Sequence, residues 1–120
     1  MTLPSSDSHL AIRDATPEIA VVVLGGRVDA ASVRSQRDQL HALPDRGIYR
    51  VVLDLGGVTF LDSAGMAMLV GLLKRARAAG GDVRMVEPAD DSVRHILQLT
   101  RLDLVFKMKE SVDAALQDLA

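Results

Sequence analysis

Short runs of apolar and β-branched residues alternate along this chain with segments whose apolar residues recur every three or four positions. The clearest run, Ile19 to Leu24, lacks polar residues and is closed by two glycines, which predicts a strand buried on both faces. Further strands are predicted over residues 10–13, 49–55, 82–86 and 105–108. Because strands that alternate with helices pair in parallel, we expect an α/β fold with a mixed, mostly parallel sheet of four to five strands.

About four helices are expected to pack on this sheet. Their predicted ranges are residues 32–43, 63–79, 90–99 and 111–119. Gly56 and Gly57 are expected to close the second buried strand, and Gly80 and Gly81 to stop the second helix.

The length of 120 residues suits one domain, which we place at residues 10–120, after a flexible N-terminus at residues 1–9. Apolar residues make up 48% of the sequence and charged residues 25%, as in an ordinary globular domain. No apolar stretch approaches the roughly 20 residues of a membrane-spanning helix, and the first residues lack a basic and hydrophobic leader. We therefore expect a cytoplasmic protein without membrane insertion.

The composition also excludes several classes of function. The chain has no cysteine, so disulfides, thiolate nucleophiles and thiolate metal sites are ruled out. Its formal net charge is −2, and its aromatic residues are only Tyr49, Phe60 and Phe106. Without a basic face or an aromatic platform for bases, direct binding of nucleic acid is not expected.

Two acidic loops are expected at the same edge of the sheet, because right-handed crossovers place all strand-to-helix loops there. They are residues 25–29 and 61–65. In the second loop Ser63 stands where a helix begins and is followed by small residues that leave it accessible. Taken alone, a serine at this position is more often an N-cap of the helix than a functional group.

Several motifs resemble those of the STAS domains of bacterial anti-sigma factor antagonists. Residues 26–29, Gly-Arg-Val-Asp, resemble the family's glycine-x-x-aspartate strand end, and residues 52–55 resemble its Val-Leu-Asp-Leu strand. The most specific motif is Phe-x-Asp-Ser-(Ser/Thr/Ala)-Gly-(Leu/Met), which residues 60–66 match. Residues 99–103 resemble the family's leucine-threonine-glycine-leucine turn. The resemblance extends from about Glu18 to Leu119 and implies a single-domain STAS-like fold.

The resemblance implies a phosphorylation switch at Ser63. It aligns Ser63 with the serine that an anti-sigma factor with serine kinase activity phosphorylates and that a PP2C-type phosphatase restores. Phosphorylation would release the anti-sigma factor and so control the availability of a sigma factor and transcription. Ala64 cannot be phosphorylated, so a single target is expected. The residues expected to bind the partner are Arg27, Asp29, Asp62, Ala64, Gly65 and Met66.

Arg27 departs from the family, which often has glutamate at this position. Its charge could pair with Asp29 or Asp62, neutralise part of a phosphate at Ser63, or match a differently charged partner. The sequence leaves these alternatives open.

An enzymatic function is not expected. Ser63 would need a base held nearby, but nothing in the sequence brings His9, His41 or His95 toward it. Asp54 is expected to make a structural hydrogen bond, and no ligand pair stands at metal-site spacing. We therefore expect no catalytic residue, metal or cofactor.

Two other binding functions stay open. A free-standing STAS subunit of a membrane lipid or anion transport complex would have a similar length and composition. Weak binding of a nucleotide or small ligand at the same sheet edge is the other alternative, although no motif supports it.

Overall fold

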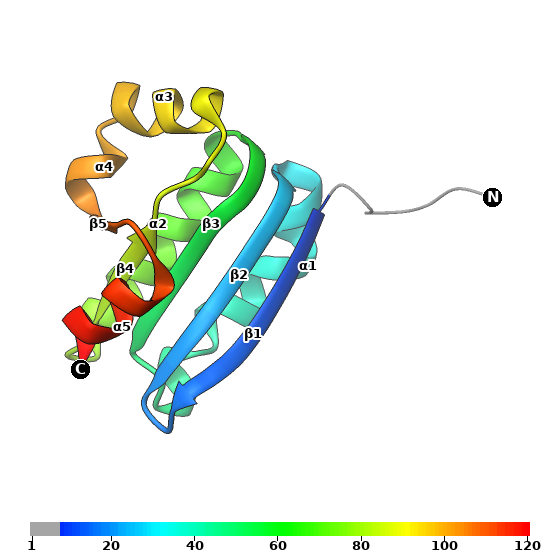
Figure 1. Ribbon diagram of the computed structural model, residues 1–120. Helices are drawn as coiled ribbons and strands as arrows, with labels where there is room; N and C mark the ends of the chain where they lie inside the picture. Colours follow the sequence, from blue (N-terminus) through cyan, green and yellow to red (C-terminus); the bar gives the residue numbers. More distant parts are fainter. Residues whose placement is uncertain (1–7) are drawn as a thin grey trace.

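The structure, a computed structural model, describes residues 8–120 as a five-stranded sheet covered by helices (Figure 1). The strands lie side by side in chain order, and β1 is antiparallel to β2 while all other neighbours are parallel. They are β1 (Ser8–Thr16), β2 (Ile19–Val28), β3 (Arg50–Leu61), β4 (Asp82–Val86) and β5 (Lys107–Lys109). The expected α/β fold with a mixed, mostly parallel sheet is confirmed.

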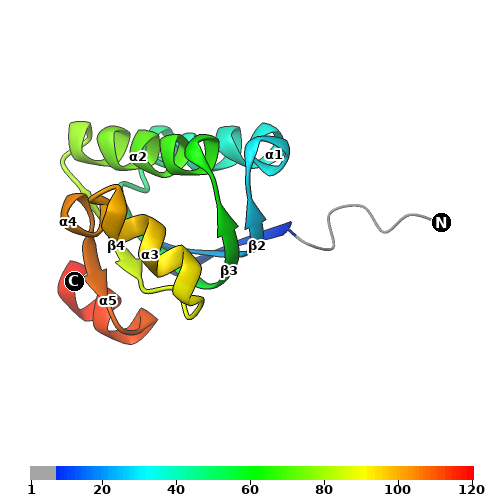
Figure 2. The same ribbon diagram turned by 90° about the horizontal axis from the view of Figure 1, so that it is seen from above.

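Helices cover both faces of the sheet (Figure 2). They are α1 (Ala30–His41), α2 (Ser63–Ala78), α3 (Asp91–Leu99), α4 (Leu102–Val105) and α5 (Val112–Leu119), with a 3₁₀ turn at Pro44–Arg46. α1 and α2 lie side by side on one face, and α5 packs on the other. No helix among residues 8–120 is both long and apolar enough to cross a membrane.

β2 supplies apolar side chains to both faces, as its unbroken apolar run predicts. Ala20, Val22 and Leu24 belong to the larger core cluster, which includes residues of α1 and α2. Ile19 and Val21 belong to a smaller cluster together with residues of α5. Burial on both faces explains why this strand has no alternation of polar and apolar residues.

The predicted end of the second buried strand at Gly56 is wrong. β3 runs on through both glycines to Leu61, because β2 also continues to Val28 and pairs with it. The pairing shifts register on either side of Gly25 and Gly57, so the glycines accommodate a bulge instead of ending the strand.

Other predicted boundaries shift at the ends of the elements. Val105 lies in α4, so the last strand begins at Lys107 and not at Val105. α1 begins at Ala30, two residues before the predicted start. Ser8 and His9, expected in the flexible N-terminus, belong to β1, while residues 1–7 of that segment lie outside the described residues.

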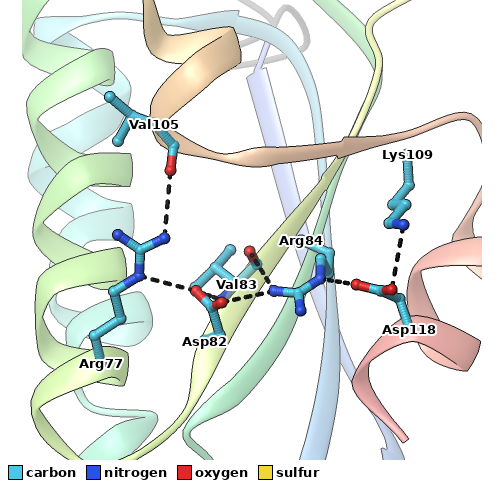
Figure 3. Close-up of polar contacts among 7 residues, drawn as sticks. All are labelled: Arg77, Asp82, Val83, Arg84, Val105, Lys109 and Asp118. Atoms are coloured by element: carbon cyan, nitrogen blue, oxygen red, sulfur yellow. Dashed lines mark hydrogen bonds and ion pairs between the residues drawn. The ribbon is translucent and has the colours of Figure 1, made fainter.

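A network of charged side chains joins β4 to α2 and α5 (Figure 3). Arg84 Nη1 donates to Asp82 Oδ2 at 2.8 Å, and Arg84 Nε donates to Asp118 Oδ2. Lys109 Nζ lies 3.3 Å from Asp118 Oδ1, and Arg77 Nε donates to Asp82 Oδ1 at 3.0 Å. Only 8% of the Arg84 side chain is exposed, so its charge depends on these carboxylates for compensation.

We predict that Arg84→Met lowers Tm at pH 7 by about 5 °C, because it leaves two partly buried carboxylates without their shared cation. The hydrogen bond from Arg84 lowers the pKa of Asp118, against an opposing effect of burial. A carboxylate with a lowered folded-state pKa stabilises the fold above its ordinary pKa, and this stabilisation is lost as the pH falls through the lowered value. The difference in Tm between wild type and variant should therefore shrink below about pH 4.

Thermal unfolding at several pH values measures this difference. Arg94→Met is the matched control, because the Arg94–Asp91 pair is exposed on α3 and should contribute little. A loss of Tm in Arg84→Met that stays constant from pH 7 to pH 3 would show that packing, and not charge, is its cause.

Candidate functional site

The loops after β2 and β3 meet at one end of the sheet, as the crossover rule predicts. Asp62 N donates to the carbonyl oxygen of Val28 at 3.3 Å, and Ala30 N donates to Asp62 Oδ2 at 3.1 Å. The N-termini of α1 and α2 therefore lie next to each other at the upper end of the sheet in Figure 1. We call residues 27–30 and 62–66 together the paired-loop site.

Asp62 joins the two helices of the paired-loop site. Its Oδ1 accepts a hydrogen bond from Gly65 N at 2.9 Å and so caps α2. Its Oδ2 accepts the hydrogen bond from Ala30 N at the start of α1. The N-cap of α2 is therefore Asp62. Ser63, which local sequence preference favours as the N-cap, is the first residue of the helix instead.

Ser63 is the first residue of α2, and it is exposed. Its hydroxyl makes no hydrogen bond to any other residue within 8–120. The positive end of the helix macrodipole lies at this position and favours an added negative charge. Ser63 therefore presents a free hydroxyl at a position where a phosphoryl group fits electrostatically.

Asp29 and Ser32 form a capping box at the start of α1. Its Oδ1 accepts from Ser32 N at 3.1 Å, and Ser32 Oγ accepts from Asp29 N at 2.9 Å. The hydrogen bond from the Ser32 backbone lowers the pKa of Asp29, burial opposes this, and Arg27 adds to the lowering. The carboxylate of Asp29 is therefore ionised at neutral pH.

Arg27 pairs with Asp29 and not with Asp62. Arg27 Nε donates to Asp29 Oδ2 at 3.2 Å, and about half of the Arg27 side chain is exposed. Its guanidinium lies over the ring of Phe60, 4.0 Å from the ring centre, because the two residues are neighbours in the β2–β3 register. The charge of Arg27 thus lies at the rim of the paired-loop site, held between a carboxylate and an aromatic ring.

Gly65 lets α2 approach the first loop closely. A Cβ atom on Gly65 would lie 2.4 Å from the Val28 carbonyl oxygen, which is far closer than van der Waals contact. Gly65 is buried, while Ala64 and Met66 are half-buried. Direct contact of these three residues with a partner stays a prediction, whereas the packing role of Gly65 is visible in the structure.

Within residues 8–120, no hydrogen bond joins Ser63 to Asp54 or to a histidine. Asp54 Oδ1 accepts from Gly56 N at 2.9 Å, which is the structural hydrogen bond expected for it. His41 Nε2 lies 3.0 Å from the carbonyl oxygen of Met68, His9 lies beside Gly25, and His95 is exposed on α3. Among residues 8–120, no three potential metal ligands of the histidine, aspartate or glutamate type lie together.

Sequence reasoning did not find two features of the site. One is the capping box of Asp29 and Ser32, which their spacing of three residues could have indicated. The other is the contact of Arg27 with Phe60, residues that are distant in sequence and that only the β2–β3 register brings together.

Several proteins that this chain resembles in sequence or fold carry the name anti-sigma factor antagonist. The STAS domain pattern matches residues 12–115. BtrV of Bordetella bronchiseptica, which bears the name anti-sigma factor antagonist, is 30% identical over 95 residues, or 79% of this chain and 81% of BtrV. The crystal structure of an anti-sigma factor antagonist from Mycobacterium paratuberculosis has a TM-score of 0.82 at 24% identity, covering 99% of this chain and 98% of that one.

A third similar structure is that of the Bacillus cell fate determinant SpoIIAA in its phosphorylated form. Its TM-score is 0.73 at 18% identity, and the match covers 93% of this chain and 100% of that one. Similarities at this level of identity show the fold, and the pattern over residues 12–115 together with the identity to BtrV shows the family. The chain therefore belongs to the STAS domain family, among the anti-sigma factor antagonists.

Proposed function

We propose that this protein binds an anti-sigma factor through the paired-loop site and that phosphorylation of Ser63 releases it. One observation carries the proposal: the hydroxyl of Ser63 is exposed and unbonded within residues 8–120, at the point where two helix N-termini meet. Release of the anti-sigma factor controls a sigma factor, so the protein regulates transcription in the cytoplasm without binding nucleic acid and without catalysis of its own.

The kinase in this proposal is the anti-sigma factor itself. The γ-phosphoryl group of ATP is transferred to Ser63 Oγ, the hydroxyl proton is lost, and ADP leaves. A PP2C-type phosphatase restores the hydroxyl by hydrolysis. Ala64 offers no second acceptor beside Ser63, which makes the modification a two-state change.

The effect of the phosphoryl group is expected on the partner and not on the fold. It adds about −1.5 to −2 charges at neutral pH. Within the protein, the backbone N–H groups at the start of α2 offset part of this charge. A partner that docks beside the carboxylates of Asp29 and Asp62 meets a further negative group, so repulsion and lost hydrogen bonds weaken the complex.

The relatives support this proposal. BtrV carries the name anti-sigma factor antagonist, and SpoIIAA has been solved in a phosphorylated form. This chain has Arg27 at a position where the family often has glutamate. Because Arg27 Nε donates to Asp29 Oδ2, the charge of Arg27 is already paired within this chain.

Phosphosite mapping tests the proposal. The protein is incubated with ATP and each candidate anti-sigma factor with serine kinase activity from the same genome, and its intact mass and modified peptides are measured. We expect one phosphoryl group, on Ser63 alone, and none on Ser63→Ala. Modification at another hydroxyl, or no modification by any candidate, would contradict the proposal, and the latter result would favour a subunit of a membrane transport complex.

A further inference from the structure

A pocket of about 420 Å³ lies between the beginning of β1 and α1, beside the paired-loop site. Ser8 of β1 and Gln36 and Gln39 of α1 line it, together with Arg27 and Asp29. Arg27 and Asp29 thus belong to both the pocket and the paired-loop site. A molecule in this pocket would therefore lie against the proposed docking surface.

Gln36 is the unusual residue of this pocket, because its amide is buried and incompletely bonded. Only 5% of the residue is exposed. Its Nε2 donates to Ser8 Oγ at 3.3 Å, but its buried Oε1 has no hydrogen-bond partner among residues 8–120. A buried polar atom without a partner is rare and destabilising.

Rotating the Gln36 amide by half a turn, which exchanges Oε1 and Nε2, does not give both atoms a hydrogen-bond partner. Ser8 Oγ could then donate to Oε1, but the NH₂ group would take the unpartnered position in its place. In either orientation the described chain satisfies one end of the amide only. Residues 8–120 therefore leave a place for one more hydrogen-bond partner of Gln36.

The remaining groups of the pocket indicate the chemistry of this partner. Both carboxylate oxygens of Asp29 are engaged, one by Ser32 N and the other by Arg27 Nε, so the two charges compensate each other. The other polar side chains of the pocket are serine hydroxyls, the amides of Gln36 and Gln39, and the imidazole of His9. Gln39 Nε2 donates to the carbonyl oxygen of Ser35, which leaves its own amide oxygen as an acceptor.

We propose that this pocket binds a small neutral molecule with several hydroxyl or amide groups, and that Gln36 is a residue that recognises it. A neutral ligand fits because the charges of Arg27 and Asp29 are already paired, and an anion would compete with Asp29 for Arg27. The amide of Gln36 gains the hydrogen bond that it lacks, by turning toward the ligand or by accepting from it.

Binding is tested on the protein alone, by chemical shift changes in ¹H–¹⁵N spectra, so failure of the phosphorylation proposal does not affect the result. The probes are two pairs of similar shape, glucose with glucuronate and acetamide with acetate. We expect the neutral member of a pair to shift the backbone amides of Ser8 and Ser35 and the side-chain amide of Gln36. Its affinity should exceed that of the anion by about tenfold or more. Absence of these shifts, or preference for the anions, would overturn the proposal.

Gln36→Met separates recognition from a purely structural role. It keeps the length of the side chain but removes both polar ends, so we expect at least a tenfold loss of affinity for the neutral probe. Because the unpartnered oxygen is gone, Tm without ligand should rise or stay unchanged. Gln98→Met, on the exposed side of α3, is the matched control and should change neither value. Unchanged probe affinity in Gln36→Met would also overturn the proposal.

Discussion

Gly65→Ala is expected to lower the free energy of unfolding by about 2 kcal/mol. The added Cβ would lie 2.4 Å from the carbonyl oxygen of Val28 and 2.8 Å from Cδ1 of Leu61. The carbonyl oxygen is backbone and cannot turn away, so α2 must shift from the first loop. That shift weakens the hydrogen bonds that Asp62 makes to both loops, and the gain of about 1 kcal/mol in helix propensity does not compensate.

Urea unfolding at neutral pH measures this effect. Gly57→Ala is the matched control, because a Cβ on Gly57 would have no neighbour closer than 3.8 Å and its φ is not in the left-handed region. It lies at the same end of the sheet and should change stability little. If Gly65→Ala had the same free energy of unfolding as Gly57→Ala, the loops would be able to separate without loss of stability. Gly65 would then not be required for their packing.

Ser63→Glu is expected to weaken binding of the anti-sigma factor by about 30-fold, while Ser63→Ala binds as the wild type does. Glutamate places a permanent negative charge at the exposed first position of α2, close to the carboxylates of Asp62 and Asp29. The start of a helix tolerates an acidic residue, so both variants should unfold with nearly the wild-type Tm. The change in affinity then reports the charge and not a loss of structure.

Isothermal titration calorimetry with the anti-sigma factor identified by phosphosite mapping measures this difference. Ser92→Glu is the control, because it adds the same charge in the first turn of α3, and it should bind normally. Wild-type affinity in both Ser63→Ala and Ser63→Glu would contradict a switch based on charge. An equal loss in both would instead show that the hydroxyl itself makes a contact needed for docking.

The sequence predicted the α/β architecture because burial leaves a direct record in the residue pattern. β2 lies between two apolar clusters, and its first six residues are all apolar. The course of β3 past Gly56 was not predictable in the same way. Glycines end strands and also accommodate bulges, and only the pairing partner, β2, decides between these outcomes.

The location of the candidate site was predictable from topology, but its internal bonding was not. Parallel strands with right-handed crossovers bring both loops to one edge whatever their side chains are. Aspartate and serine are both good N-caps, so local preference cannot decide between Asp62 and Ser63. The decision comes from the contact of Asp62 with Ala30, across 32 positions of sequence, which no local pattern records.

The direction of the strands also makes the two ends of the molecule unlike each other. β2 and β3 carry the chain to the end where α1 and α2 begin, whereas the last residue follows α5 at the opposite end of the sheet (Figure 1). A fluorescent reporter or a solid support attached after Ala120 would therefore stand away from Ser63. A sensor surface coupled in this way would display the paired-loop site to the solution in a single orientation.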